Sequence, residues 1–418
     1  ASDRAAAAAV SAATTQRNAL RAREIAAAAT AGKDREAARR AVEAAEMELG
    51  PIRTSLGDLR RQVEEIAKTV LAQARVVGAT ATKLFLSPQT FGSFSTIIID
   101  EASMLIPPAL YNAAGLATER VIVSGDFRQL SPIISTNERC LKEELGRDVF
   151  SLAGIQRDFD AKRRDLKRTT LLREQYRMAD PICRLLSQPM YRGMLRTSAQ
   201  RPNATQLAPA PFAGPLVIVD TSTLGPVAAK DARGSWANLM SALTVRNICR
   251  HLSEAGLAND RDGVGAIVPY AGQRKLIQRM LADAKLDTIT AGTVHRYQGD
   301  EKRLIVLDLV DGIGRSFPGL WHQADQPTDE GAKLFNVAIS RARDHLVIVG
   351  DLAWLDRKLP GASLLRQWLH QVQDLGSVVD ARRILAMWPM AEDLRRYGTT
   401  LAVDLDAART GIFDEKDF

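Results

Sequence analysis

Hydrophobic residues are spaced differently in the first 75 residues and in the rest of the chain. The first part is rich in Ala, Arg and Glu and is interrupted once, at Gly50-Pro51. After this interruption, apolar residues recur at intervals of four and three, namely Ile52, Leu56, Leu59, Val63, Ile66 and Val70. Because that spacing is typical of a coiled-coil seam, we expect an antiparallel helical hairpin of residues 1–49 against 52–74.

The role of this hairpin is open between two alternatives. It is either a solvated spacer or an arm that contacts nucleic acid. Its arginines are interleaved with glutamates, and this mixture of charges argues against a strong phosphate-binding face.

From Ala74 onward, short β-branched runs alternate with helical stretches such as LTVRNICRHLSEAG. Continuous apolar strands that alternate with helices predict parallel sheets covered on both faces. The stretch between Leu130 and Thr170, with its KRRDLKR run, indicates a boundary between two α/β units. The expected strands lie in ARVVGAT, STIIID, RVIVSGD, PLVIVD, VGAIVP, RLIVLDLV and HLVIVGD. Ligands of such sheets bind beyond the carboxyl ends of the strands, which is where most polar clusters of this chain fall.

Two adjacent carboxylates, Asp100 and Glu101, directly follow the strand in STIIID. In a nucleotide-hydrolysing site, one acid can hold Mg²⁺ and the next can orient an attacking water. The alternative is an acid that caps the start of a helix. The next strand places Asp126 and Gln129 in its exit loop, where Asp126 either holds the loop around Gln129 or belongs to the site itself.

Composition limits the class of protein. A chain of 418 residues that is 46% hydrophobic and 25% charged is expected to be globular, with two or three domains. The net charge of +7 and the pI of about 9.4 suit a polyanionic partner without requiring one. The three cysteines and five histidines show no spacing of a zinc site. The sequence contains no apolar run of membrane-spanning length and no visible signal peptide, so we expect a cytoplasmic protein.

Six motifs carry a resemblance to a known family. In order, DEAS, GDFRQLSP, LREQYRM, VPYAGQ, GTVHRYQGDE and NVAISRAR resemble motifs II to VI of superfamily 1 helicases. The most similar branch is superfamily 1B, which includes the nonsense-mediated-decay RNA helicase and its DNA-helicase relatives. The resemblance covers about residues 74–373. Heavy use of Ala and Arg fits a GC-rich bacterial source.

The resemblance implies an α/β fold with two RecA-like P-loop NTPase domains, the first of them incomplete, and an N-terminal α-helical hairpin insertion. ATP would bind between the two domains, and single-stranded nucleic acid would bind across them. The expected division is a helical hairpin insertion at 1–74, the C-terminal part of the first RecA-like domain at 75–165, the second RecA-like domain at 166–375, and a C-terminal extension or linker at 376–418.

The resemblance also implies the roles of the residues that handle ATP. Asp100 would hold Mg²⁺, Glu101 would act as the base that positions water, and Gln129 would contact the γ-phosphate. Arg177 and Arg341 would come from the second domain. Their planar, permanently charged guanidinium groups suit the stabilisation of charge on the γ-phosphoryl group during transfer.

The nucleoside would be held by residues of two further motifs. Tyr176 would stack on the adenine ring. Gly299 and Glu301 belong to the QGDE run, where the carboxylate of Glu301 would accept hydrogen bonds from the ribose hydroxyls. Arg343 is expected to be a supporting ion-pair partner and Tyr297 a packing residue.

For nucleic acid, the resemblance points to small hydroxyls and backbone amides that grip the phosphate backbone without reading bases. For Tyr270, contact with a base and packing in the core remain alternatives. Nothing in the sequence separates DNA from RNA. The residues implied are Thr80, Thr82, Pro132, Pro269, Tyr270 and Thr293.

The chain contains no G-x-x-x-x-G-K-[ST] loop to cradle the phosphates of a nucleotide. Gly32-Lys33 is followed by Asp34 and has no upstream glycine or preceding strand. In the family this loop precedes the helical insertion, so we expect it before residue 1. We therefore expect these 418 residues alone not to hydrolyse ATP appreciably.

The tail after about Gln373 resembles the linker that leads into a phospholipase-D-like nuclease domain in some bacterial helicases. The nuclease signature H-x-K-x₄-D occurs nowhere in the sequence, so an ordinary C-terminal extension is the alternative.

Three functions stay open. The first is an ATP-dependent helicase or translocase on single-stranded DNA or RNA that moves 5′ to 3′, as the branch does. The second is a nucleic-acid-stimulated ATPase switch, coupled to a nuclease, without processive unwinding. The third is a catalytically dead binding module, although the presence of both acids and both arginines argues against it.

Overall fold

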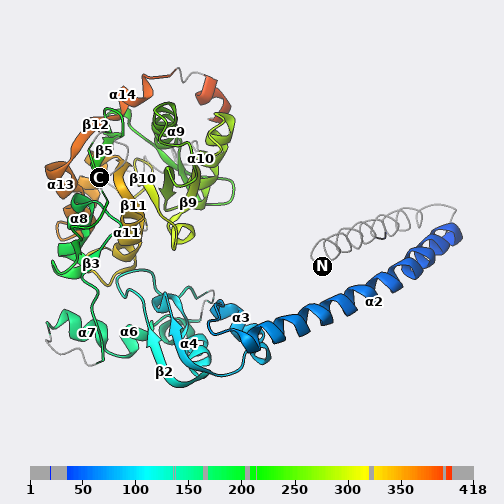
Figure 1. Cartoon of the computed structure of the whole chain (residues 1–418). Helices are drawn as coiled ribbons and strands as arrows, with labels where there is room; N and C mark the ends of the chain where they lie inside the picture. Colours follow the sequence, from blue (N-terminus) through cyan, green and yellow to red (C-terminus); the bar gives the residue numbers. More distant parts are fainter. Residues whose placement is uncertain are drawn as a thin grey trace. The chain divides into compact units, whose positions relative to one another are not determined.

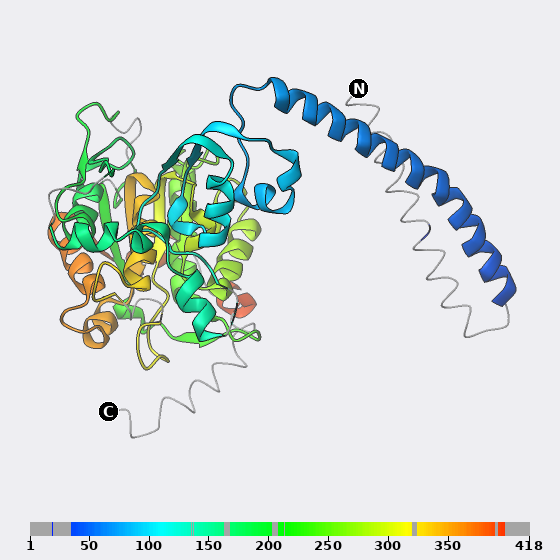
Figure 2. The same cartoon turned by 90° about the horizontal axis from the view of Figure 1, so that it is seen from below.

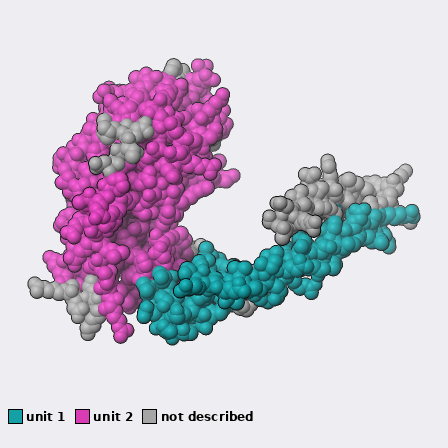
Figure 3. All heavy atoms as spheres, viewed as in Figure 1, with its two compact units in different colours: residues 1–98, 108–122 teal, residues 99–107, 123–418 magenta. Residues whose placement is uncertain are grey.

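The computed structural model describes residues 19, 35–134, 136, 138–162, 168–202, 208–212, 214–319, 324–388 and 392–397. It divides the chain into two compact units, which Figure 3 distinguishes by colour. Unit 1 comprises residues 1–98 with 108–122, and unit 2 comprises residues 99–107 with 123–418.

The most prominent element of unit 1 is helix α2, Arg35–Gln73, which both views show as one uninterrupted ribbon (Figures 1 and 2). The predicted break at Gly50-Pro51 is therefore wrong. Pro51 removes only the backbone hydrogen bond to the carbonyl of Met47, and the helix is exposed there, so water can satisfy that carbonyl. Most of the first arm of the predicted hairpin lies outside the described residues.

The rest of unit 1 places two short strands side by side. At their start the backbone N–H of Phe94 donates to Leu116 O, over 2.9 Å. Ile98, Val121 and Ile122 are 68%, 41% and 44% exposed, so this small sheet is poorly covered by the described residues. The last residue of β1, the first residue of α4 and the last residue of β2 belong to unit 2. The elements of this part of the chain are α3 (Ala81–Leu86), η1 (Pro88–Thr90), β1 (Phe94–Ile99), α4 (Pro107–Ala114) and β2 (Ala117–Val123).

Unit 2 is built on a six-stranded sheet in the order β12-β5-β11-β10-β8-β9, in which every pairing is parallel. The prediction of an α/β fold with a parallel sheet is confirmed. The strands are β5 (Leu216–Asp220), β8 (Val264–Val268), β9 (Thr290–Thr293), β10 (Lys302–Asp308), β11 (Ala342–Gly350) and β12 (Ser377–Asp380). Because β12 pairs with β5, the sheet continues past residue 375, the predicted end of the second RecA-like domain.

Helices cover both faces of this sheet because successive side chains of a strand point to opposite faces. Leu216 and Ile218 join one hydrophobic cluster, while Val217 and Val219 join the other. The first cluster includes side chains of α8 (Asp180–Tyr191), α11 (Glu330–Ser340), α12 (Leu352–Lys358) and α13 (Leu364–Leu375). The second includes side chains of α9 (Leu239–Glu254), α10 (Ala271–Asp283) and α14 (Ala381–Leu385).

Shorter elements of unit 2 connect these layers. The two-stranded sheets are β3 (Glu174–Gln175) with β4 (Arg196–Thr197), and β6 (Ala228–Lys230) with β7 (Trp236–Asn238). The short helices are η2 (Ala102–Met104), α5 (Arg139–Leu145), α6 (Val149–Leu152), α7 (Ile155–Asp160), η3 (Ser222–Leu224) and η4 (Val294–Tyr297). Among the described residues, every helix is too short or too polar to cross a membrane.

Candidate functional site

The acidic pair lies where strand β1 ends. Ser124 N donates to Ile99 O over 2.8 Å, and Ala102 N donates to Ser124 O over 3.0 Å, so the two strand exits are tied together. Glu101 adopts a left-handed backbone conformation, with φ 51° and ψ 36°, and its side chain caps no helix. This argues against the helix-cap alternative, and a strained residue in this position is a feature of functional sites.

Asp100 and Glu101 are both exposed, so their carboxylates are open to ligands. Mg²⁺ keeps several waters in protein sites and binds through one or two carboxylates together with phosphate oxygens. The pair fits that requirement. Among the described residues, no group of three or more His, Cys, Asp or Glu side chains is placed to hold a metal ion. Waters and phosphate oxygens would therefore supply the other ligands of a Mg²⁺ ion at this pair.

The loop after β2 is organised by Asp126. Its Oδ1 accepts a hydrogen bond from Arg128 N at 2.8 Å, and its Oδ2 accepts one from Gln129 Nε2 at 3.0 Å. The same Oδ2 accepts a bond from the Tyr191 hydroxyl at 2.6 Å. Asp126 therefore holds the loop around Gln129, which is the first of the two roles considered for it.

Arg128 anchors the same loop from within the core, where its side chain is 1% exposed. Its Nε donates to Met190 O at 3.1 Å, and its guanidinium forms an ion pair with Asp160. The guanidinium carbon lies 5.2 Å from the ring centroid of Phe127 and 5.7 Å from that of Phe159. A buried arginine in GDFRQLSP has no periodic signal in the sequence, so its anchoring role was not predicted.

Arg341, at the end of α11, is brought to Gln129. Its side chain is 2% exposed, and its Nη2 lies 3.3 Å from Gln129 Oε1. Nε also donates to Val337 O at 3.2 Å and Nη1 to Asp300 O at 3.4 Å. Burial lowers the pKa of Arg341 to about 10, with repulsion from Arg177 acting in the same direction and attraction to Glu101 acting against it. The guanidinium remains charged at neutral pH.

Arg177 and Arg343 share one carboxylate. Arg177 Nε donates to Glu301 Oε2 at 2.5 Å, and Arg343 Nη1 lies 3.6 Å from Glu301 Oε1. Arg177 Nη1 also donates to Ser340 O at 3.4 Å, which places this guanidinium beside Arg341. Arg343 has the ion-pair role predicted for it. Glu301, expected at the ribose, is occupied here by two arginines, an arrangement that sequence motifs do not reveal.

The remaining nucleoside candidates lie in open positions. Tyr176 follows β3 and is 55% exposed. Gly299 has a φ of +82°, and a Cβ added there would meet nothing within 4 Å.

Tyr297 is 3% exposed, and its hydroxyl donates to Thr290 O at 2.7 Å, so its predicted packing role is confirmed. Gly292 makes room for it, since a Cβ there would lie 2.5 Å from the Tyr297 ring.

The nucleic-acid candidates fall in both units. Thr80 and Thr82 belong to unit 1, where Thr80 caps α3 by accepting a bond from Lys83 N at 3.2 Å. In unit 2, Thr293 ends β9 opposite Val268, so it lies at the same carboxyl edge as Pro269. Pro132 is buried in the same unit.

Tyr270 is half-buried, and its contacts favour the packing alternative. Its hydroxyl donates to Asp311 Oδ1 at 2.9 Å, and the guanidinium carbon of Arg315 lies 5.2 Å from its ring centroid. Burial raises the pKa of Asp311 to about 6, against the attraction of Arg315. Tyr270 is therefore part of a polar cluster at the end of β10.

A second buried carboxylate, Asp308, explains the glutamine of VPYAGQ. Gln273 Nε2 donates to Asp308 Oδ2 at 2.6 Å, and Gln273 Oε1 accepts a bond from Asn238 N at 2.8 Å. Burial raises the pKa of Asp308 to about 6, opposed by hydrogen bonds from Ser241 and Gln273. These contacts join α10 to β10, so the glutamine has a structural use.

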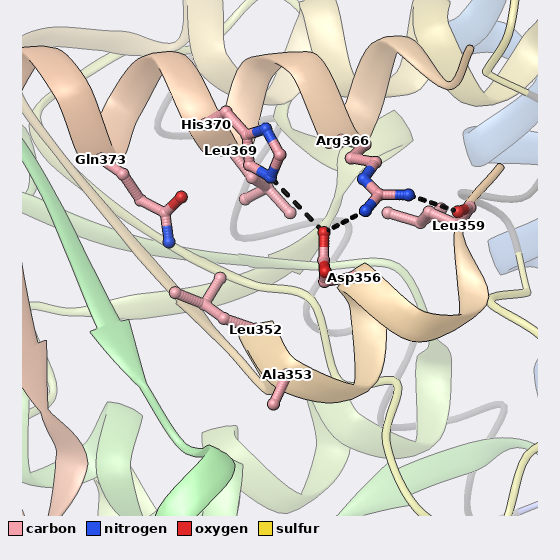
Figure 4. Close-up of a pocket in the computed structure, with 8 residues that line it drawn as sticks. All are labelled: Leu352, Ala353, Asp356, Leu359, Arg366, Leu369, His370 and Gln373. Carbon is pink, nitrogen blue, oxygen red and sulfur yellow. Dashed lines mark hydrogen bonds and ion pairs between the residues drawn. The ribbon is translucent and has the colours of Figure 1, made fainter. Parts of the chain in front are cut away.

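A surface pocket of about 420 Å³ lies between α12 and α13 (Figure 4). Inside it Arg366 Nη2 lies 2.7 Å from Asp356 Oδ1, and His370 Nε2 lies 3.5 Å from the same oxygen. It is lined by Leu352, Ala353, Asp356, Leu359, Arg366, Leu369, His370 and Gln373. None of the predicted site residues lines it.

The comparisons with known proteins agree with this fold and with the motifs. Two family models, each described as an AAA domain, match residues 2–137 and 156–353. The parallel α/β fold and the two family models place the chain in the class of RecA-like nucleotide-binding proteins. Within that class, the chain belongs to superfamily 1B of the helicases.

Three curated relatives illustrate the likeness. DNA polymerase alpha-associated DNA helicase A of Saccharomyces cerevisiae is 26% identical over 347 residues, which cover 77% of this chain and 48% of the relative. ATP-dependent helicase NAM7 of the same yeast is 26% identical over 342 residues, or 78% and 32%. DNA replication ATP-dependent helicase/nuclease DNA2 of Bos taurus is 24% identical over 317 residues, or 69% and 27%. The chain thus spans about a quarter to a half of the length of these relatives.

Proposed function

We propose that this chain carries the catalytic acids, the γ-phosphate sensor and the arginine fingers of an ATP-dependent helicase or translocase that acts on single-stranded nucleic acid. The observation that carries the proposal is the contact of buried Arg341 with Gln129, beside Arg177. A charged, buried guanidinium next to a glutamine in the loop after a strand suits the recognition of a γ-phosphate. The printed names of two relatives, a DNA helicase and an ATP-dependent helicase, support the same function.

In this proposal Asp100 holds Mg²⁺ through its water shell, and Glu101 orients the attacking water and accepts its proton. Bound Mg²⁺ neutralises charge that develops on the phosphates. Gln129 contacts the γ-phosphate, and the guanidinium of Arg341 stabilises its charge during transfer. Arg177 acts with Arg341 once ATP competes with Glu301 for its guanidinium.

The nucleoside and strand contacts belong to the same proposal. Tyr176 stacks on adenine, and Gly299 with Glu301 lies at the ribose. Single-stranded DNA or RNA contacts the backbone-gripping residues Thr80, Thr82, Pro132, Pro269 and Thr293, while Tyr270 supports them by packing against Asp311 and Arg315. Movement 5′ to 3′ and the division into two RecA-like domains are carried over from the family, whereas a cytoplasmic location is proposed from the sequence alone.

These 418 residues contain no phosphate-cradling G-x-x-x-x-G-K-[ST] loop, so we propose that turnover needs a loop that this sequence does not supply. The poorly covered strands β1 and β2 favour the expectation that further strands flank them. The prediction is that the isolated chain shows no appreciable ATPase activity, and robust turnover by it would refute this part of the proposal.

A second function is favoured by one of the relatives. The printed name of the bovine relative joins a helicase to a nuclease, so an ATPase switch that guides a nuclease, in the same chain or as a partner, is the alternative. ATPase and strand-displacement assays on the full-length gene product, with DNA and RNA in parallel, separate the functions. Turnover with displacement supports the helicase, turnover alone supports the switch, and neither activity leaves a catalytically dead binding module.

A further inference from the structure

Helix α11 touches the loop after β2 at three points. Arg341 Nη2 donates to Gln129 Oε1, at 3.3 Å. Lys333 Nζ donates to Ser131 Oγ at 2.8 Å. Asn336, between these two along the helix, donates from Nδ2 to Arg128 O at 2.9 Å. The loop that carries Gln129 is therefore bound along the length of α11.

Asn336 makes a second contact, with a residue that none of the six motifs contains. Its Nδ2 also donates to the hydroxyl of Tyr191 at 2.8 Å, and that hydroxyl donates to Asp126 Oδ2 at 2.6 Å. The direction of these bonds is fixed, because an ionised carboxylate only accepts and a tyrosine hydroxyl has one proton to give. Burial, followed by repulsion from Asp126, raises the pKa of Tyr191 well above its usual value. The hydroxyl thus stays a donor at physiological pH.

This chain of bonds ends on the side-chain amide of Gln129. Asp126 Oδ2 accepts from Gln129 Nε2 at 3.0 Å, so the amide nitrogen is held on that side. The amide oxygen then faces Arg341. Without Tyr191, Asp126 loses a charge-assisted bond that limits the rotation of its carboxylate. The amide of Gln129 would then be less firmly oriented.

We propose that Tyr191 and Asn336 are positioning residues for ATP hydrolysis, which act through Asp126 to orient Gln129 toward Arg341 and the γ-phosphate. This inference rests on the proposed function. Neither residue touches the nucleotide in this account, so their loss affects the rate of the chemical step more than the binding of ATP.

The chain offers a matched control. Tyr397 is buried, and its hydroxyl donates to Asp283 Oδ2 at 2.5 Å, on α10. Tyr191→Phe and Tyr397→Phe therefore each remove one hydroxyl from a tyrosine–aspartate hydrogen bond. In the full-length gene product, Tyr191→Phe should lower kcat about tenfold and change the KM for ATP by less than about twofold. Tyr397→Phe should leave both parameters as in the wild type.

A second measurement tests the path through Gln129. In a Gln129→Ala background, Tyr191→Phe should change kcat by less than about twofold, because the group that it orients is gone. Asn336→Ala should reproduce the loss of kcat seen with Tyr191→Phe, and it carries the test if Tyr191→Phe does not fold. Thermal unfolding of each variant shows whether it folds.

The outcomes separate this inference from the proposed function. If the wild-type gene product hydrolyses ATP and Tyr191→Phe matches Tyr397→Phe in kcat, the positioning role is overturned while the proposed function stands. If Tyr191→Phe lowers kcat about tenfold in the Gln129→Ala background as well, the positioning role is also overturned. A wild-type gene product that does not hydrolyse ATP removes both.

Discussion

Arg341 Nη2 donates to Gln129 Oε1 over 3.3 Å, although the two residues lie 212 positions apart in the sequence. The contact joins the end of α11 to the loop after β2. Glu101 also attracts the guanidinium of Arg341 strongly enough to affect its pKa. Arg341, a proposed finger, therefore interacts both with the proposed sensor Gln129 and with one of the two acids, Glu101.

The first prediction concerns the geometry of Arg341. Arg341→Lys keeps a positive charge but loses the planar fork that reaches Gln129 Oε1 and the backbone carbonyl of Asp300 together. We expect kcat for ATP in the full-length gene product to fall about 10³-fold. Arg343→Lys is the control, because Arg343 is paired only loosely with Glu301, at 3.6 Å, and should lose less than about tenfold. A similar loss for both variants would contradict the assignment.

The second prediction compares two ion pairs of unit 2. The side chains of Arg201 and Asp344 are 10% and 13% exposed, whereas those of Arg177 and Glu301 are 39% and 38% exposed. Removing one partner of a buried pair leaves an uncompensated charge, so Asp344→Asn should lower the free energy of unfolding by about 3 kcal/mol. Solvent screens the other pair, so Glu301→Gln should lower it by less than about 1 kcal/mol. Urea unfolding of this chain measures both, and equal losses would count against this explanation.

The third prediction concerns pH. The pKa of Asp308 is raised from 3.8 to about 6 in the folded chain, chiefly by burial. A carboxyl with a raised folded pKa stabilises the folded state fully below pH 3.8, and that contribution is lost as the pH rises through about 6. The shift corresponds to about 3 kcal/mol, and Asp311 acts in the same direction.

Unfolding experiments between pH 4 and pH 7 should therefore show stability that falls with rising pH because of these two groups. Asp308→Asn should flatten the dependence. Asp380→Asn is the control, because the Asp380 carboxyl is only partly buried and its pKa is lowered to about 2 by Arg382, outside this range. A wild-type slope retained in Asp308→Asn would show that Asp308 does not titrate as described.

Much of the fold could be predicted because its signals are local. Continuous β-branched runs such as LVIVD and VGAIV became fully or largely buried parallel strands. The runs STIIID and RVIVSGD likewise located the strands β1 and β2, after which Asp100 and Gln129 were expected. The strand predicted in ARVVGAT is wrong, because residues 74–80 form no strand. Helix α2 was harder, because Pro51 removes one hydrogen bond without ending an exposed helix, so the proline alone did not mark a boundary.

The details of the site depend on contacts between distant residues, which periodicity does not encode. Tyr191 and Asp126 are 65 positions apart, and Arg177 and Glu301 are 124 positions apart. The motifs indicated which residues belong to a site but not which carboxylate holds which arginine. The burial of Asp308 could not be read from an acid at the end of an apolar strand, because the exposed Asp100 has the same local pattern.

Glu101 is proposed as the base in an ATP site that Gln129 and Arg341 complete. The most direct test of this role is the rate of ATP hydrolysis by the Glu101→Gln variant of the full-length gene product, measured with its affinity for ATP. Glutamine has nearly the same shape but cannot accept the proton of the attacking water. We expect turnover to fall to background while ATP binding stays within about twofold of the wild type. Turnover equal to that of the wild type would contradict it.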